Sequence, residues 1–407
     1  MTGRRPAFRA RRGIGVVLIA TILIAGLRWH RQSREADFRR ECRYAFETED
    51  WATLGEASAQ WQAFNPASED ALLYLAEFRA RSGDMAAAVD LLTSLPDESD
   101  KTVAALMTAV DIQFQELQRP LDGLNTLDRL IRLAPEVSGF RRRQLFFYAM
   151  TLQRTKLIAA IRSSIEDRAE PPEAYVYLVL AGNLSFTNGV GVTQRWLSAS
   201  PEETTFQIAF QIQKADFLSL MDAPTEQSRR ELESTWKSLD RLLEQNPTNP
   251  ILVRHRLFRA AADDDSSEVG RLLSQLPDEA WDDSVFLRYR AWFSHRQGQL
   301  DEAEESYRRS LQVFPMDWQT WQGLAEVLRR KGSFDRAEEA QKIALEGKEL
   351  RKTLVQQPDA AEIQLEHLAR IEEFARHCGD RTVSKAISKR LAEQYYTPIQ
   401  ETASASG

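Results

Sequence analysis

The chain has 407 residues, of which 43% are hydrophobic and 28% are charged, so it is long enough for several domains or for one extended array. This composition excludes an intrinsically disordered chain, and the mean hydropathy of −0.44 excludes a protein with many membrane spans. The two cysteines, Cys42 and Cys378, are too few for a disulfide framework or a thiolate zinc site.

Charge is distributed unevenly along the chain. Eight of the 53 lysines and arginines precede residue 35, whereas all 60 acidic residues follow residue 34. Because an acidic body is repelled by phosphate backbones, we expect no nucleic-acid partner.

The first predicted element is a transmembrane anchor at residues 13–29, which follows a basic tail at residues 1–12. Residues 13–27 hold no charged side chain. As a helix they would span about 22 Å, and the long side chains of Arg12 and Arg28 can extend the span toward the head groups. Because no small-residue cleavage site ends the apolar run, we favour an uncleaved signal-anchor over a cleaved signal peptide.

The orientation of this single-pass anchor in the cell membrane follows from its flanks. Five arginines precede the span within twelve residues and six follow it closely, so the arginine counts on the two sides are nearly equal. A short charged tail is nevertheless costly to translocate, whereas a long domain crosses largely regardless of charge. We therefore expect the N-terminus inside and the repeat domain on the non-cytoplasmic side.

Residues 34–357 carry a regular pattern of prolines. Each of these prolines follows an apolar stretch with helical spacing, and a proline ends a helix because it lacks the N–H group. A spacing of roughly 36 residues indicates paired helices, about ten pairs up to residue 397. The prolines are Pro66, Pro96, Pro135, Pro171, Pro201, Pro247, Pro277, Pro315 and Pro358.

Residues 140–280 are the divergent part of this pattern. The run at residues 175–180 fits either a short strand or a buried helix. Residues 263–265, three consecutive aspartates, are predicted to form a solvated turn that caps the following helix.

One segment is duplicated 34 residues later, as Ala291, Gly298, Asp301, Ala303, Glu304 and Glu305, then Ala325, Gly332, Asp335, Ala337, Glu338 and Glu339. The glycines can adopt a positive φ and end a first helix. Asp301 and Asp335 are predicted to cap the N-terminus of a second helix, with Glu304 and Glu338 as capping-box partners.

This duplicated segment resembles the tetratricopeptide repeat (TPR). One unit carries the family's positions at Trp321, Leu324, Ala325, Leu328, Gly332, Ala337 and Ala344. The unit before it carries Leu287, Ala291, Gly298, Ala303, Tyr307 and Pro315, and an earlier one carries Leu72, Leu75, Ala76, Gly83 and Ala88. The unit that ends at Pro135 has Gly123 where alanine is usual. The resemblance implies an all-α superhelical array, but it indicates little about the function.

The C-terminal part of the chain follows the array. Residues 334–357 have only Gly347 as a helix breaker and are predicted to form one long helix. Residues 358–397 are predicted to form two capping helices, because the last unit would otherwise expose an apolar face. Residues 398–407 are predicted to be a disordered tail.

No motif for catalysis is present. The sequence lacks a phosphate-binding loop, a zinc-protease motif and a nucleophile elbow, so we expect no catalytic residue, no metal and no cofactor. An enzyme with an unrecognised site in residues 140–280 is the alternative, and a cluster of buried carboxylates or histidines with perturbed pKa values there would favour it.

The resemblance implies a partner-binding concave surface formed by the first helix of each pair. The corresponding residues of the two clearest units are Arg288, Trp292, His295, Arg296, Gln319, Gln322, Glu326, Arg329 and Arg330. Arginine side chains suit carboxylates, so we expect an extended acidic segment of a partner protein. The alternative is a solvated helix face on which Trp292 is partly packed between its neighbours.

These expectations favour a membrane-tethered scaffold that binds partner proteins. A second interpretation is an assembly or regulatory module of an envelope or polysaccharide biosynthesis complex.

Overall fold

The computed structural model describes the backbone of residues 7–404 except residues 183, 185, 187, 222, 358 and 359. It describes the side chains of residues 25–393 with the same exceptions and without residue 27. Within this part, all regular structure is helical, so the predicted all-α fold is confirmed. The chain forms two compact units, Met1–Leu133 and Ala134–Gly407, which we describe separately.

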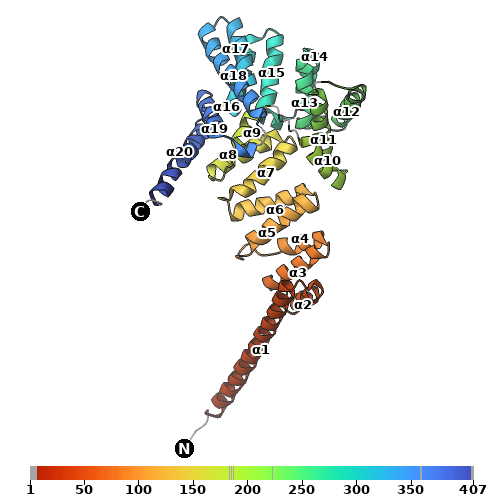
Figure 1. Cartoon of the computed structure of the whole chain (residues 1–407), viewed down its shortest axis with the longest axis vertical. Helices are drawn as coiled ribbons and strands as arrows, with labels where there is room; N and C mark the ends of the chain where they lie inside the picture. Colours follow the sequence, from red (N-terminus) through yellow and green to blue (C-terminus); the bar gives the residue numbers. More distant parts are fainter. Residues whose placement is uncertain are drawn as a thin grey trace, which may run out of the picture. The chain divides into compact units, whose positions relative to one another are not determined.

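The described residues of unit 1 form six α-helices and one short π-helix, η1; the α-helices are labelled α1 to α6 in Figure 1. Its core consists of two apolar clusters, one around Trp61 between α1, α2 and α3, and one around Leu95 and Ala105 between α3, α4 and α5. The elements are α1 Ala7–Glu47, α2 Trp51–Phe64, α3 Glu69–Arg81, α4 Met85–Thr93, α5 Thr102–Asp111, η1 Ile112–Glu116 and α6 Pro120–Leu133.

Unit 2 contains the remaining fourteen α-helices and two short 3-10 turns. The helices are α7 Ser138–Met150, α8 Arg154–Glu166, α9 Glu173–Leu180, α10 Gly189–Ala199, α11 Thr204–Ser219, α12 Glu226–Gln245, α13 Pro250–Ala262, α14 Ser266–Ser274, α15 Ser284–Arg296, α16 Leu300–Val313, α17 Trp318–Arg330, α18 Phe334–Val355, α19 Leu365–His377 and α20 Arg381–Ser404. The 3-10 turns are η2 Asp278–Asp282 and η3 Ala360–Glu362.

The prolines mark the ends of helix pairs as predicted. Every even-numbered helix from α2 to α18 ends between two and five residues before one of the nine prolines. In chain order the described helices divide into ten consecutive pairs, from α1 and α2 to α19 and α20, but α9 and α10 do not pack together as a pair: α10 packs on α11, and α9 packs on α7, α8, α18 and α19. The long helix predicted at residues 334–357 is α18.

The turns of the duplicated segment confirm one prediction and correct another. Gly298 and Gly332 both have φ of +77° and follow the ends of α15 and α17, as predicted. The N-cap prediction for Asp301 and Asp335 is wrong, because the cap positions are Gln299 and Ser333, which make no side-chain capping bond. Both aspartates lie inside the first helical turn, where a carboxylate interacts favourably with the helix dipole.

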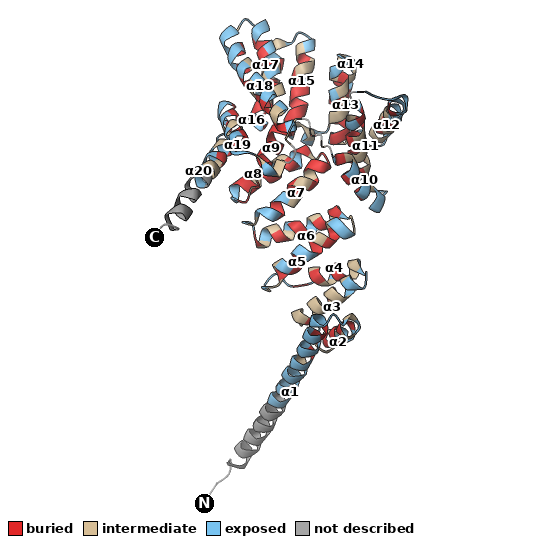
Figure 2. Ribbon diagram, in the orientation of Figure 1, coloured by how far each residue is buried: buried red, intermediate tan, exposed pale blue. Residues whose placement is uncertain are grey.

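Residues 175–180 form most of α9, a fully buried helix rather than a strand (Figure 2). Every residue from Glu173 to Leu180 is less than 10% exposed. The helix contacts α7 and α8 as well as the distant α18 and α19 (Figure 1). All-round burial explains why this segment is apolar without a helical period.

The C-terminal pair packs against two parts of unit 2. On α19, the Phe374 ring lies against Gly347 of α18, where an added Cβ would be 2.5 Å from the ring. At the start of α20, Asp380 accepts a hydrogen bond of 2.8 Å from Arg162 of α8. Residues 358–397 thus contact both the last repeat and the middle of the unit. α20 extends to Ser404, but the side chains after residue 393 lie outside the described part, and the disordered tail stays a prediction.

The expected membrane anchor, residues 13–29, lies largely outside the described side chains. These residues belong to α1, which has 41 residues. Among the residues that were described, none of the helices has the length and apolarity to cross a bilayer.

Candidate functional site

The predicted binding residues lie on α15 and α17, two helices fixed at their first turn by aspartates. Asp283 accepts a hydrogen bond of 3.0 Å from the Val285 amide, and Asp317 accepts one of 3.1 Å from the Gln319 amide. Each aspartate satisfies amides that the first helical turn leaves without partners. The two helices contact each other, so their first-helix faces form one surface.

Arg288 does not belong to that surface. It is 7% exposed, and its guanidinium donates hydrogen bonds of 2.9 and 2.6 Å to the two carboxylate oxygens of Asp317. A partner protein cannot reach this side chain without unfolding α15, so its predicted binding role is wrong. Its observed contact joins α15 to the N-terminus of α17.

A second buried ion pair, absent from the sequence-based prediction, holds the start of α15. Arg154 of α8 donates a hydrogen bond of 2.5 Å to Asp283, and Arg254 of α13 lies 3.7 Å from the same carboxylate. Burial would raise the pKa of Asp283, but Arg154 and Arg254 attract the carboxylate and hold its pKa below the usual value. In the sequence, Asp283 is recognisable only as an aspartate that precedes a helix. Its partner Arg154 lies 129 residues away and cannot be inferred from that local pattern.

Trp292 is half-buried, in agreement with the alternative prediction for this residue. Its ring packs against the apolar cluster of α13, α14 and α15, and the guanidinium of Arg296 lies 5.2 Å above it. Arg296 also forms an ion pair of 2.7 Å with Asp264 in the turn before α14. The same turn caps the following helix as predicted, because Asp265 accepts a hydrogen bond from the Glu268 amide at the start of α14. A partner would therefore meet Arg296 with its charge already paired.

His295 lies half-buried between the two helices. Burial lowers its pKa, and the positive charges of Arg330 and Arg296 lower it further. Its Nε2 atom is buried and has no hydrogen-bond partner within the described residues. His295 is therefore neutral at pH 7 and carries one polar atom that a partner or a water could satisfy.

The predicted residues of α17 are the accessible part of the surface. Gln319 is half-buried, with its amide oxygen 3.6 Å from where a Cβ of Gly182 would lie. Gln322, Glu326, Arg329 and Arg330 are exposed. Neither Arg329 nor Arg330 has an ion pair among the described residues, so two cations are free to bind an anion.

We call this surface the α15–α17 face, formed by His295, Arg296, Gln322, Glu326, Arg329 and Arg330. Its free charges are two arginines and one glutamate, so it is locally positive within an acidic chain. This positive strip is short, because both free cations lie in the last turn of α17, and it suits the carboxylates of a partner segment.

The described residues offer little for catalysis or metal binding. They contain no group of three or more histidine, cysteine, aspartate or glutamate side chains placed to hold a metal ion. Within residues 140–280, burial raises the pKa of Asp216 to about 6 and lowers that of His255 to about 3. The His255 ring stacks on Trp236, and arginines supply the charges around it. These two groups do not influence each other's pKa and therefore do not form an acid–base pair.

Comparison with known proteins supports the TPR assignment. A family model described as tetratricopeptide repeat matches residues 296–351, from the end of α15 into α18. No curated protein sequence matches the chain.

Solved structures resemble the chain only loosely. The APC/C hetero-tetramer Cut9–Hcn1 gives 13% identity over 88% of this chain and 79% of its own, with a TM-score of 0.32. A tetratricopeptide repeat protein from Parabacteroides merdae gives 12% identity over 73% of this chain and 99% of its own, with a TM-score of 0.27. Yeast Tom70 gives 12% over 89% of both chains, also with a TM-score of 0.27. The match to the tetratricopeptide repeat model thus covers residues 296–351, and the regular structure of the described residues is helical.

Proposed function

We propose that the protein is a non-catalytic scaffold that binds an extended acidic segment of a partner protein on the α15–α17 face. The observation that carries this proposal is the pair of exposed cations, Arg329 and Arg330, which have no ion pair among the described residues. They lie within the segment that matches the tetratricopeptide repeat model, and repeats of this family commonly bind proteins. The positive strip is distinct from the acidic remainder of the chain, which gives a partner a defined place to bind.

We further propose that residues 13–29 tether this scaffold to the cell membrane, with the repeats on the non-cytoplasmic side. The support is the uncharged run at residues 13–27 with arginines on both flanks. A tether raises the effective concentration of every bound partner at the membrane surface.

Charge reversal on α17 tests the binding proposal. In the full chain, Arg329→Glu with Arg330→Glu should reduce the number of crosslinks to partner proteins about tenfold. Two glutamates repel the acidic segment that the two arginines attract. Crosslinking followed by mass spectrometry measures this loss. The matched control is Arg229→Glu with Arg241→Glu on α12, where both arginines are also exposed and have no ion pair among the described residues. Equal crosslinking by the two double variants would remove the α15–α17 face from consideration.

Alkaline extraction tests the tether separately. The full chain should stay in the membrane pellet, whereas a chain that begins at residue 30 should move to the supernatant. Release of the full chain by alkali would contradict the tether and leave the binding proposal intact.

A further inference from the structure

Unit 1 contains a cavity that the proposed function does not use. Its volume is about 410 Å³, within the range of ligand-binding pockets. It is open to solvent on one side and lies between the second helices α4 and α6, with residues of α5 and η1 also lining it. The α15–α17 face, in contrast, is formed by first helices of unit 2.

The π-helix η1 places a polar side chain in this cavity. Gln113, the second residue of η1, is 5% exposed and lines the cavity, and its amide oxygen has no donor within the described residues. The local backbone is held by the Arg119 amide, which donates a hydrogen bond of 2.7 Å to the Gln113 carbonyl. A buried acceptor without a donor is unfavourable, and π-turns are often found at functional sites. A ligand that brings an N–H group would relieve this cost.

Glycine at position 123 helps to form the wall next to Gln113. The Phe114 ring packs directly on Gly123, and a Cβ at that position would be 2.4 Å from the ring. This contact explains the glycine in place of the usual alanine. The floor of the cavity is apolar, with Val89, Leu106 and Leu117.

The rim of the cavity is mainly negative. Asp90 of α4 and Asp122 of α6 are exposed, and neither carboxylate has an ion pair among the described residues. Arg129 is already occupied, because it donates hydrogen bonds of 2.6 Å to both the Thr93 carbonyl and Asp97. Arg119 is the one lining cation that has no such partner in the described part of the chain.

We propose that this cavity binds an arginine side chain of a partner polypeptide. The guanidinium has five donors and no acceptor, which matches two free carboxylates and the unpartnered amide oxygen of Gln113. The methylene stem of the arginine matches the apolar floor. Among the described residues, a carboxylate or phosphate ligand would find one unpaired cation, Arg119, against the two unpaired carboxylates of Asp90 and Asp122, so the balance of unpaired charge favours a cation.

Titration of the full chain with a short peptide tests the proposal. The probe is a blocked pentapeptide with one arginine between glycines, and its citrulline analogue is the uncharged counterpart. Isothermal calorimetry should show saturable binding of the arginine peptide with a Kd of about 1 mM or tighter and none of the citrulline peptide. Absence of saturation by about 10 mM, or equal binding of both peptides, would overturn the proposal.

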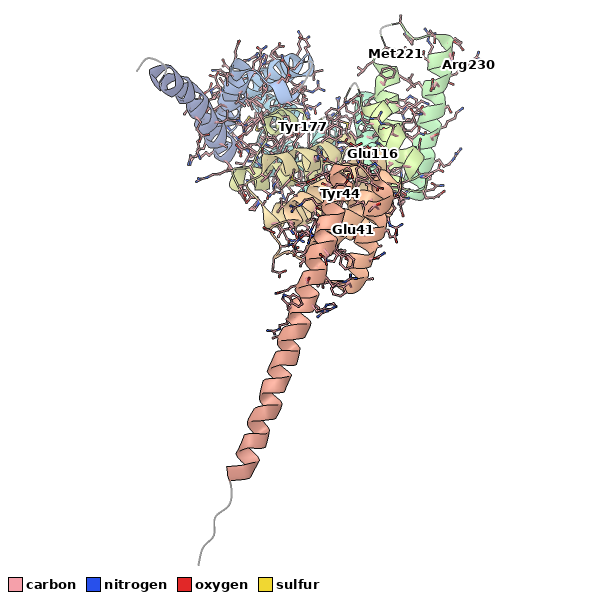
Figure 3. All side chains as sticks on the ribbon, turned by 60° about the horizontal axis from the view of Figure 1, so that its bottom comes forward. Glu41, Tyr44, Glu116, Tyr177, Met221 and Arg230 are labelled. Carbon is pink, nitrogen blue, oxygen red and sulfur yellow. The ribbon has the colours of Figure 1, made fainter. Side chains whose placement is uncertain are left out.

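Two variants locate the binding. Asp90→Asn with Asp122→Asn should weaken arginine-peptide binding about tenfold. The matched control is Asp100→Asn with Glu116→Gln, which removes two exposed carboxylates of unit 1 that do not line the cavity; Glu116 ends η1 and is labelled in Figure 3. The same weakening in both double variants would show a general charge effect and reject the cavity as the site.

Gln113→Met separates a binding role from a structural one. Methionine keeps the unbranched shape but removes the unpartnered oxygen, so the variant should bind the arginine peptide more weakly without a lower melting temperature. Unchanged peptide binding, or a clear loss of thermal stability, would overturn the assignment of Gln113 to the ligand.

Discussion

Among single residues, Asp283 and Asp317 each have two structural roles. Each caps a helix and each accepts a buried guanidinium, from Arg154 and Arg288 respectively. A buried ion pair contributes little when both partners are present, because desolvation offsets the attraction. The loss of one partner is costly, since the other charge stays buried without compensation.

The change Asp283→Ala should therefore destabilise the protein by about 3 kcal/mol or more at pH 7. Thermal or urea unfolding measures this difference. The depressed pKa of Asp283 means that its contribution is present above the unfolded pKa and is lost as the pH falls through the lower folded pKa. The difference between wild type and variant should shrink at about pH 3, where the unfolded carboxyl is protonated.

The neighbouring Asp282 supplies the control for this prediction. It is exposed and has no ion pair among the described residues, so Asp282→Ala should change stability by less than about 0.5 kcal/mol. Similar effects of the two substitutions would contradict the importance of the buried pair.

Among the helices, some turns within a pair contain a glycine with positive φ, as at Gly298 and Gly332, whereas others place a different residue in this conformation, as at Leu152 and Asp264. Gly332 has φ of +77° and no atom within 4 Å of an added Cβ. Its replacement by alanine therefore tests backbone conformation alone, without a steric clash. We expect Gly332→Ala to destabilise the protein by about 1 kcal/mol, measured by the midpoint of thermal unfolding.

Gly191 provides a control, because its replacement by alanine is expected to raise the stability rather than lower it. It lies inside α10, and an added Cβ would meet only the flexible Arg195 side chain at 3.8 Å. Alanine favours the helix, so Gly191→Ala should stabilise the protein by up to about 1 kcal/mol. If both substitutions lowered the midpoint equally, the positive φ would not be the cause.

At the scale of the whole molecule, unit 2 departs from a linear repeat array. In a linear array each repeat contacts only its neighbours. Here Arg162 of α8 donates to Asp380 before α20, and Arg390 of α20 donates a hydrogen bond of 2.9 Å to the Glu170 carbonyl. Both contacts join residues more than 200 positions apart. They also enclose α9, so unit 2 has a central buried helix.

The reversal Arg162→Glu tests this closure. It places a carboxylate beside the buried Asp380, so hydrogen exchange should become faster in α8 and α9 as well as in α20. Mass spectrometry of exchanged peptides measures the protection of each helix. Lys385→Glu, an exposed change on α20, should leave α9 unaffected. Faster exchange confined to α20 would indicate that α9 does not depend on this contact.

Most helix ends and the match to the tetratricopeptide repeat follow from the amino-acid sequence alone, with the exception of residues 175–180, whose pattern fits a strand or a helix. Prolines, glycines with positive φ and apolar spacing act over a few residues, so their effect is visible in the linear order. The same local pattern placed Gln322, Glu326, Arg329 and Arg330 together on one helix face, where the structure also has them.

Which of those residues a partner can reach depends on how the helices pack in three dimensions. Arg288 and Arg329 have the same chemistry in the sequence, yet one is buried against Asp317 and the other is exposed. The burial of α9 and the cavity beside Gln113 likewise depend on segments distant in the chain or on an irregular turn. Such contacts follow from packing between helices, which local spacing does not encode.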